Sequence, residues 1–372
     1  MSAGVYLHIP FCKSRCSYCD FATDVYRNKE SVERYVAAIC DEIPGSVSEE
    51  TIVDTIYFGG GTPSLLTPNQ AEAILKTVGT CFNVHPDSEI TMEMNPATVT
   101  PETLRGFRSL GVNRASFGVQ TFNDRALKLL ARGHDANDAR QTYRMLRDAG
   151  FENVSFDLIA GLPGQTLDDW ETNLDEAIQM SPEHLSLYLL EIHEGTPLAE
   201  QVRSGRQPTP DEEVAAEMYE IMLDRLAAAG HEQYEISNFA KPGFESRHNS
   251  KYWTLDPVFG FGVSAHSFDG RQRYANERDT AKYVAMIERT ASAEVVRENI
   301  DLASEFVFLG LRMENGIDLA DYRDRFGHDL APRYKGQLAE LAMADLVQSS
   351  GDRLRLTRKG KLFSNEVFAV FV

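Results

Sequence analysis

Residues 5–21 read Val5-Tyr6-Leu7-His8-Ile9-Pro10-Phe11-Cys12-Lys13-Ser14-Arg15-Cys16-Ser17-Tyr18-Cys19-Asp20-Phe21. An apolar, strand-like run therefore leads straight into a loop with three cysteines in the spacing C-x3-C-x2-C. A [4Fe–4S] cube has four irons, so three thiolates leave one iron without a protein ligand. That iron can chelate a small molecule through an amino group and a carboxylate, and S-adenosylmethionine is the obvious one. We predict that Cys12, Cys16 and Cys19 hold such a cluster.

Two other uses of these cysteines need to be weighed. A structural zinc site usually takes four ligands in two closely spaced pairs, and this chain offers no second pair. His8 could serve as a fourth ligand, but it lies on the predicted strand rather than in the loop. A disulfide is disfavoured in a chain with five cysteines and no secretory segment. The spacing therefore favours the cluster.

Length and composition indicate a soluble globular protein. The 372 residues suffice for one large domain and a smaller one. No run approaches the roughly 20 apolar residues of a membrane span, so we do not expect an integral membrane protein. The start of the chain has no signal-peptide pattern, which predicts a cytoplasmic protein whose thiolates stay reduced. The net charge of −19 argues against a nucleic-acid partner but leaves docking to a membrane protein open.

The first two thirds of the chain alternate strand-like and helix-like segments. The predicted strands are 5–9, 53–58, 89–95, 114–119, 154–159 and 185–191. The predicted helices are 32–43, 68–78, 101–110, 136–149, 167–180 and 211–229. Thr67-Pro68 and Thr100-Pro101 support two helix starts, because a threonine cap followed by proline favours a helix. Six such units predict a parallel α/β sheet, which periodicity alone cannot divide between a partial barrel and a doubly wound open sheet.

After about residue 230 the alternation stops. We expect a short strand at 233–238, a polar, aromatic loop up to Trp253 and a glycine-rich segment at 260–262. The last 70 residues predict helices at 304–312, 319–326 and 333–344 and a hairpin of 346–348 with 353–356. Thr357 caps a final short helix, and the tail resembles a small winged-helix unit. The prediction is therefore two domains, 1–230 and 231–372.

The tail also carries a short basic run. It contains Arg353, Arg355, Arg358, Lys359 and Lys361. A winged helix with basic residues could indicate DNA binding. Because the whole chain is strongly acidic and the wing is only a few residues long, a structural or protein-docking role is preferable.

Polar residues follow successive predicted strands. Gly59-Gly60-Gly61-Thr62-Pro63 follows the second strand, and its glycines allow a ligand to approach the backbone closely. Glu93 ends the third strand, Gln120 follows the fourth and Asp157 lies in the fifth. In parallel α/β folds the functional residues gather at these strand ends. Arg132 adds a positive group suited to a carboxylate.

These motifs resemble the radical S-adenosylmethionine superfamily and, within it, the oxygen-independent coproporphyrinogen oxidase branch. The resemblance rests on the cysteine loop, on His8-Ile9-Pro10-Phe11-Cys12, and on residues 59–63, 118–122 and 157–164, and it runs from residue 4 to the C-terminus. It implies an open three-quarter barrel, a partial (β/α)6 TIM-like fold, with a C-terminal α+β accessory domain. It also implies cofactor contacts at Tyr6, Tyr18, Gly60, Gly61, Thr62, Glu93, Gln120, Arg132 and Asp157.

Two departures point to the heme-chaperone sub-family of that branch. Asp20-Phe21 stands where the coproporphyrinogen-oxidising members have Gly-Cys. Only 11 residues precede Cys12, whereas those members have a longer N-terminal extension.

The resemblance extends to an H-N-x-x-Y-W element associated with heme. It implies heme contacts at His248, Asn249, Tyr252 and Trp253. A neutral imidazole can ligate heme iron, and the aromatic rings offer flat faces to a porphyrin. A single histidine in a polar loop is otherwise more often a hydrogen-bonding residue. Ser246 stands where the sub-family often has Cys, and His266 is a second possible ligand.

The resemblance thus implies a heme chaperone with a [4Fe–4S] cluster, S-adenosylmethionine and heme. Its expected partners are heme and heme-accepting proteins, membrane-bound respiratory proteins among them. The competing activity is oxidative decarboxylation of coproporphyrinogen III to protoporphyrinogen IX, which requires S-adenosylmethionine cleavage. A related activity, porphyrin methylation or heme breakdown, is a third alternative, but no residue of the sequence indicates it.

Overall fold

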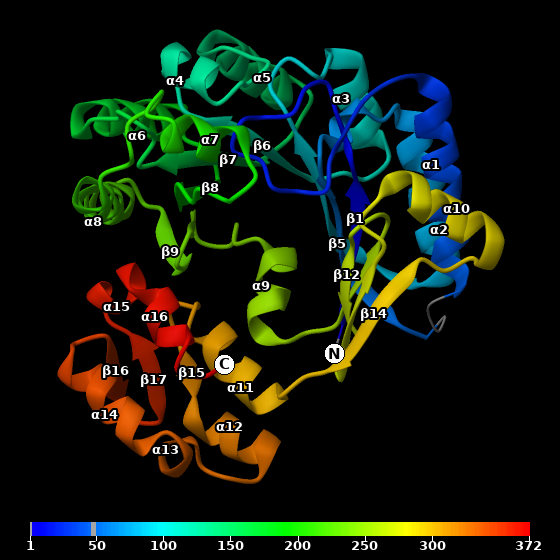
Figure 1. Ribbon diagram of the computed structural model, residues 1–372. Coiled ribbons are helices and arrows are strands. Elements are labelled where there is room, and N and C mark those ends of the chain that lie inside the picture. The colour runs from blue at the N-terminus through cyan, green and yellow to red at the C-terminus, as the bar shows by residue number, and fades with distance from the viewer. Residues whose placement is uncertain (1, 46–49) are drawn as a thin grey trace.

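A twelve-stranded sheet organises the chain in the computed structural model, which describes residues 2–45 and 50–372 (Figure 1). Six neighbouring strands are parallel throughout. They are β1 (Ala3–Ile9), β4 (Ile52–Gly60), β5 (Asn83–Met94), β6 (Arg114–Gln120), β7 (Asn153–Ala160) and β8 (His184–Leu189). The six predicted strands are therefore confirmed, and they follow one another in space in chain order, as a partial barrel requires.

Helices cover the outer face of these strands. They are α1 (Lys29–Glu42), α2 (Pro68–Cys81), α3 (Pro101–Ser109), α5 (Ala136–Asp148), α6 (Leu167–Met180) and α8 (Glu212–Ala228). The short helices α4 (Asp124–Leu129) and α7 (Pro197–Arg203) lie instead at the strand ends, where both contact the cysteine loop. The side chain of Thr67 accepts from the backbone of Gln70, and that of Thr100 accepts from Thr103. Both caps are reciprocal capping boxes with proline at the helix start, as the sequence predicts.

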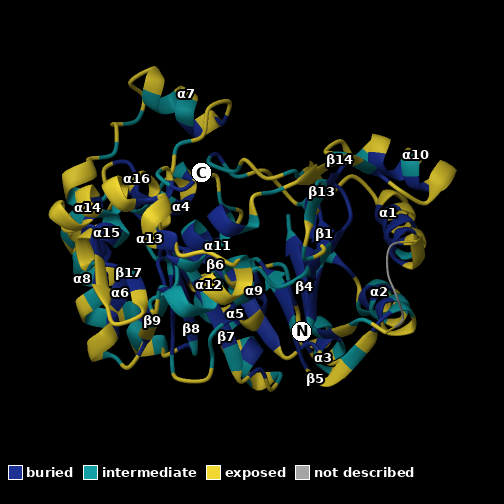
Figure 2. Ribbon diagram, turned by 90° about the horizontal axis from the view of Figure 1, so that it is seen from below, coloured by how far each residue is buried: buried dark blue, intermediate teal, exposed yellow. Residues whose placement is uncertain are grey.

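The two faces of the curved sheet differ in chemistry because strand side chains alternate. On β7, Phe156 packs on Tyr143 of α5 with ring centres 5.2 Å apart, so it belongs to the outer, apolar core. Its neighbour Asp157 points to the inner face. Figure 2 shows the strands buried and the helices exposed on their outer sides. The outer face of the partial barrel is therefore apolar and covered by helices, and its inner face is polar.

The region after residue 230 continues the same sheet. β9 (Glu232–Glu235) and β10 (Asn238–Ala240) extend one edge beyond β8. At the other edge, β11 (Val258–Phe261) runs parallel to β1, followed by β12 (His266–Phe268), β13 (Gln272–Asn276) and β14 (Glu294–Asn299). In the chain, the helix α10 (Thr280–Thr290) connects β13 and β14. The boundary after residue 230 stays a prediction, although the sheet itself runs on to residue 299.

The predicted polar, aromatic loop before Trp253 was wrong in its last part. Residues Arg247–Thr254 form a helix, α9, that lies between the sheet and the C-terminal unit (Figure 1). Ser246 caps it by accepting from the backbone of Asn249. The Glu89 carboxylate accepts the N–H groups of Arg247 and His248 at 3.2 and 3.1 Å. A cap from β5, far away in the sequence, explains why the local pattern did not predict this helix.

The C-terminal unit has a core of its own. Its helices are α11 (Leu302–Gly310), α12 (Leu319–Phe326), α13 (Leu330–Arg333), α14 (Lys335–Met343), α15 (Arg358–Leu362) and α16 (Ser364–Phe368). A small sheet pairs β15 (Ile317–Asp318), β17 (Arg353–Leu356) and β16 (Val347–Ser350), so Ser349 and Ser350 lie in a strand rather than in the predicted turn. Thr357 caps α15 as predicted.

Acidic residues neutralise much of the basic run in this unit. Arg358 pairs with Glu220 and Asp224 of α8, and Lys361 pairs with Glu314. The Arg358 pairs fasten the unit to the barrel, in line with a structural role for the basic run. The helices within the described ranges include none with the length and apolarity needed to cross a membrane.

A buried carboxylate fastens α1 to the far edge of the sheet. Glu42 accepts hydrogen bonds from Gly262 N at 2.8 Å, Asn276 Nδ2 at 2.5 Å and Tyr283 Oη at 2.6 Å. Burial raises its pKa to about 7, although these hydrogen bonds oppose the shift. The folded state therefore holds a proton that the unfolded state releases near pH 4.5, so the free energy of unfolding falls as pH rises between these values.

We expect Glu42→Ala to lower the free energy of unfolding by about 2–3 kcal/mol, because buried donors lose their acceptor. The variant should also lose the fall in stability between pH 4.5 and 7 that this carboxylate causes. Urea titrations at several pH values measure both effects. Glu33→Ala, an exposed position on the same helix, is the control. Equal stability of the two variants would contradict a fastening role for Glu42.

Candidate functional site

One cavity of ≈ 690 Å³ gathers most of the predicted site residues at the ends of the parallel strands. Its lining includes Cys12, Cys16, Cys19, Tyr18, Gly60, Gly61, Glu93, Gln120, Arg132 and Asp157. Two predicted cofactor contacts lie outside the lining. Thr62 is behind Cys12, and Tyr6 lies deeper in the barrel, with its hydroxyl 3.1 Å from His8 Nδ1. The resemblance thus predicted residues that the fold brings together from several strand ends and the loops beside them.

Backbone pairing holds the cysteine loop in place. β2 (Phe11–Cys12) pairs with β3 (Asp24–Val25), and the backbone N–H of Tyr26 donates to the Cys12 carbonyl at 2.8 Å. Ser17 N donates to the Leu130 carbonyl at 2.9 Å, which ties the middle of the loop to the end of α4. The loop therefore closes on itself and on the barrel before any cofactor is considered.

The three thiols fit a four-iron cluster better than a single ion. All are free and half-buried. Thr62 Oγ1 donates to Cys12 Sγ at 3.7 Å, and Arg132 Nη1 donates to Cys16 Sγ at 3.4 Å. Within the part of the chain that the structure describes, no three His, Cys, Asp or Glu side chains converge on one metal ion. A cube places each thiolate on its own iron, so it needs no such convergence, and the donors suit its anionic sulfurs.

The glycine run lets the backbone pass close to the cysteine loop. Gly60 has a φ of +109°, which side chains other than hydrogen rarely tolerate. A Cβ on Gly61 would lie 2.7 Å from the Pro10 carbonyl. Any larger residue at Gly61 would therefore push the loop that carries Cys12 away from the sheet.

Glu93 is held at the strand end beside this run. Tyr57 Oη donates to its Oε1 at 2.8 Å, and Gly60 N donates to its Oε2 at 3.2 Å. Burial raises the pKa of Glu93 to about 7, the Tyr57 hydrogen bond lowers it, and Asp157 raises it further. A carboxyl group with a pKa near 7 is partly protonated at neutral pH, and a bound cation favours its ionised form.

Asp157 and Gln120 complete the far side of the cavity. Burial raises the pKa of Asp157 to about 6, and Arg114 is the main opposing influence. Gln120 has a φ of +66°, a left-handed conformation at the point where β6 turns into its loop. Strain of this kind is typical of residues whose position serves a site.

Asn95 joins the two sides of the cavity and was missed by the sequence analysis. Its Nδ2 donates to Thr62 Oγ1 at 2.8 Å, and its Oδ1 accepts from Arg132 Nη2 at 2.6 Å. Burial opposes the charge of Arg132, but Tyr18 and Cys16 outweigh it, so its pKa is raised. The signal that could have found Asn95 is its place two residues after Glu93, at the end of β5.

The predicted heme residues lie apart from this cavity. His248 is only 1% exposed and stacks on Tyr57 with ring centres 5.0 Å apart. Its Nδ1 lies 2.9 Å from Thr55 Oγ1 and its Nε2 lies 3.2 Å from Tyr252 Oη, so both ring nitrogens have partners. Burial lowers its pKa to about 3. The imidazole is neutral, as a heme ligand must be, but it is enclosed.

The other members of the element are also on α9. Asn249 and Tyr252 are half-buried and do not line the cavity. Trp253 does not line the cavity. Its ring centre lies 4.2 Å from the guanidinium of Arg312, and Arg312 does line the cavity. His266 is exposed on β12. The second possible ligand therefore lies on a strand and not on α9.

We expect Glu93→Gln to weaken S-adenosylmethionine binding about tenfold or more, because a charge-assisted contact is lost. The pKa of Glu93 near 7 adds a pH signature. The carboxylate ionises as pH rises through 7, so the affinity of the wild type for this cation should increase from pH 6 to pH 8. Calorimetry on the variant should show a flatter profile. Glu72→Gln on α2, an exposed position, is the control and should bind normally.

Comparison with known proteins agrees with this geometry. Residues 6–177 match the Radical SAM superfamily, and residues 298–363 match the HemN C-terminal domain. The chain is 37% identical to the heme chaperone HemW of Bacillus subtilis, over 99% of both chains. It is 37% identical to HemW of Mycobacterium tuberculosis, over 98% of this chain and 93% of that protein.

A solved structure shares the fold over the whole chain. Coproporphyrinogen III oxidase (HemN) from Escherichia coli superposes with a TM-score of 0.88 at 24% identity and covers 100% of this chain and 90% of its own. This likeness confirms the partial barrel and its C-terminal unit. Taken with the identity to the curated relatives along its entire length, it shows that the chain belongs to the HemW family of the radical SAM superfamily.

Proposed function

We propose that this protein is a heme chaperone that binds heme and passes it to heme-dependent acceptor proteins. The observation that carries this proposal is the end-to-end identity to proteins named heme chaperone HemW. Membership of the radical SAM superfamily adds a [4Fe–4S] cluster and S-adenosylmethionine. The cavity gathers most of the residues that the resemblance implies for both, which supports the proposal that the cofactor site of the superfamily is kept.

The residues of the cavity divide the task of holding these groups. Cys12, Cys16 and Cys19 would hold the cluster, which when bound supplies an electron to S-adenosylmethionine. Arg132 donates to the sulfur of Cys16, and Glu93 offers a carboxylate to the cationic cofactor. The remaining cofactor contacts stay as the resemblance implies them, Tyr6 and Thr62 included.

The acceptors are heme-dependent proteins, and we include membrane-bound respiratory proteins among them. Because none of the described helices suits a membrane span, the chain would meet such an acceptor at the membrane surface. We place this encounter in the cytoplasm, where cluster thiolates stay reduced.

Oxidative decarboxylation of coproporphyrinogen III is the second function to test. Its support is the shared fold with the Escherichia coli enzyme, at 24% identity. Against it stand the higher identity to the chaperones and the replacement of Gly-Cys by Asp20-Phe21. Fold alone does not transfer a reaction.

The two functions separate in one anaerobic experiment on the reconstituted protein with reductant and S-adenosylmethionine. We expect stoichiometric heme binding and transfer to an apo heme protein faster than from free heme. Coproporphyrinogen III should not be converted to protoporphyrinogen IX. Conversion without heme transfer would contradict the proposal and favour the dehydrogenase.

A heme contact at His248, Asn249, Tyr252 and Trp253 remains part of the proposal, with a structural condition. His248 must exchange its contacts to Thr55 and Tyr252 for the iron. The element would therefore bind heme only after α9 moves away from the inner face of the sheet.

His248→Ala should weaken heme binding and remove the imidazole signature from the heme spectrum. It should also lower the free energy of unfolding by about 1–3 kcal/mol, because two hydroxyls lose their partner. Spectral titration and urea unfolding measure the two effects separately. A folded variant with unchanged heme affinity and spectrum would leave His248 with the structural role alone.

A further inference from the structure

Arg114 is a charged side chain on the inner face of the sheet, outside the lining of the cavity at the strand ends. It begins β6, and its neighbour Ala115 packs in the apolar outer core, so strand alternation turns Arg114 and Ser116 inward. Arg114 lies opposite Thr91 of β5 in the sheet register, and Ser116 lies opposite Glu93. Arg114 therefore sits one pleat, about 7 Å along the strand, below Glu93.

This guanidinium is buried without a contact partner on two of its nitrogens. Arg114 is 1% exposed, and its Nε and Nη1 make no hydrogen bond with any residue that the structure describes. The buried hydroxyl of Thr91, its register neighbour, is unpartnered in the same sense. Arginine keeps its proton in proteins, and an isolated charge is costly to bury. Ionised groups at a longer distance must therefore balance the charge of Arg114.

Two carboxyl groups above Arg114 respond to its charge. Burial raises the pKa of Asp157, and Arg114 is the strongest influence in the opposite direction. Burial also raises the pKa of Glu93, which the hydrogen bond from Tyr57 lowers and the charge of Arg114 lowers further. Ser116 adds a hydrogen bond to Asp157. The same strand therefore offers Asp157 both a donor and a fixed positive charge.

Other elements face these carboxyl groups with neutral side chains. Burial raises the pKa of five surrounding tyrosines, which are Tyr6 of β1, Tyr18 of the cysteine loop, Tyr57 of β4, Tyr188 of β8 and Tyr252 of α9. Burial lowers the pKa of His184 and of His248, and the charge of Arg114 contributes to both shifts. Phenols and imidazoles in these states carry no charge at neutral pH, so they do not balance Arg114.

Arg132 is a second cation near Asp157, but it serves the cysteine side of the cavity. Its Nη2 donates to Asn95 Oδ1 at 2.6 Å and to the Gly118 carbonyl at 2.8 Å, and its Nη1 donates to Cys16 Sγ at 3.4 Å. Arg114 acts on the carboxyl groups from the opposite direction, from below and through its charge.

We propose that Arg114 is a positioning residue of the cofactor site, whose fixed charge favours the ionised forms of Glu93 and Asp157 for a cationic ligand that Arg114 does not touch. The inference rests on the proposed cofactor contacts of these two carboxylates, and its ligand is the cation S-adenosylmethionine. Its geometric basis is a buried guanidinium one pleat below Glu93 and outside the lining of the cavity. Removal of the charge would leave both carboxyl groups in place but favour their protonated, uncharged forms.

The test measures S-adenosylmethionine affinity by calorimetry from pH 6 to pH 9 on the anaerobically reconstituted protein. Relative to wild type at the same pH, Arg114→Met should bind about fivefold or more weakly at pH 7. The reason is that an ionisation midpoint one pH unit higher, at about 8, leaves only about a tenth of the carboxyl group ionised there. The deficit should shrink toward pH 9, where the carboxyl groups ionise in both proteins.

Two further variants serve as controls. Arg114→Lys keeps the charge and should restore most of the affinity. Arg105→Met on α3 removes the same charge at an exposed position and should bind normally at every pH. Urea unfolding verifies that each variant is folded, and Arg114→Gln takes the place of Arg114→Met if the latter is not.

The outcomes distinguish this inference from the cofactor site on which it rests. If wild type binds no S-adenosylmethionine, the cofactor site fails, and the inference with it. If wild type binds it and the uncharged variant matches wild type at every pH, the site stands and the role of Arg114 is overturned. A loss of affinity that is equal at every pH, or one that Arg114→Lys shares, would also overturn it and would leave Arg114 with a purely structural role.

Discussion

The burial of ionisable groups on the inner face of the sheet is the constraint on which the site depends. Arg114 is 1% exposed, and its Nε and Nη1 have no hydrogen-bond partner among the described residues. Its positive charge opposes the rise in pKa that burial imposes on Asp157 and, more weakly, on Glu93. A charge is costly to bury alone, so cation and carboxylates stabilise one another there. The helices outside permit this arrangement because they supply the apolar core that the inner face lacks.

Hydrogen bonds carry this constraint from the sheet to the cysteine loop. Asn95 bridges Arg132 and Thr62, which donate in turn to the sulfurs of Cys16 and Cys12. A shift of any member would move a donor away from a sulfur that we propose as a cluster ligand. Asn95, at the end of β5, therefore positions the donors to two of the three proposed ligands without touching those ligands. Outer partners of this kind fix ligand orientation at metal centres generally.

The sequence predicted what depends on local pattern and missed what depends on distant partners. Strand alternation and the caps at Thr67 and Thr100 are local, and the structure confirms the strands and helices that they predict. α9 reads as a loop because its cap includes Glu89, more than 150 residues away. β11 joins β1 in parallel, a pairing that no short-range signal indicates. The cofactor residues came from a family resemblance, and Asn95 fell outside its motifs.

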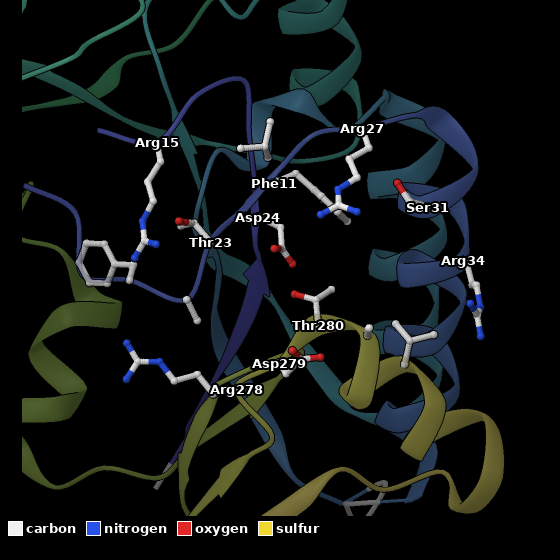
Figure 3. Close-up of a pocket in the computed structure, with 15 residues that line it drawn as sticks. Phe11, Arg15, Thr23, Asp24, Arg27, Ser31, Arg34, Arg278, Asp279 and Thr280 are labelled. Atoms are coloured by element: carbon white, nitrogen blue, oxygen red, sulfur yellow. The ribbon is translucent and has the colours of Figure 1, made fainter. Parts of the chain in front are cut away.

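The cysteine loop separates two cavities and lines both. Arg15, Phe21 and Thr23 belong to each lining, whereas Arg27 and Arg278 belong only to that of the outer cavity, which Figure 3 shows. The loop that identifies the superfamily by its cysteines thus also presents Phe21, the residue that marks the departure from coproporphyrinogen chemistry. One short segment therefore lines the cavity at the strand ends on one side and a second cavity on the other.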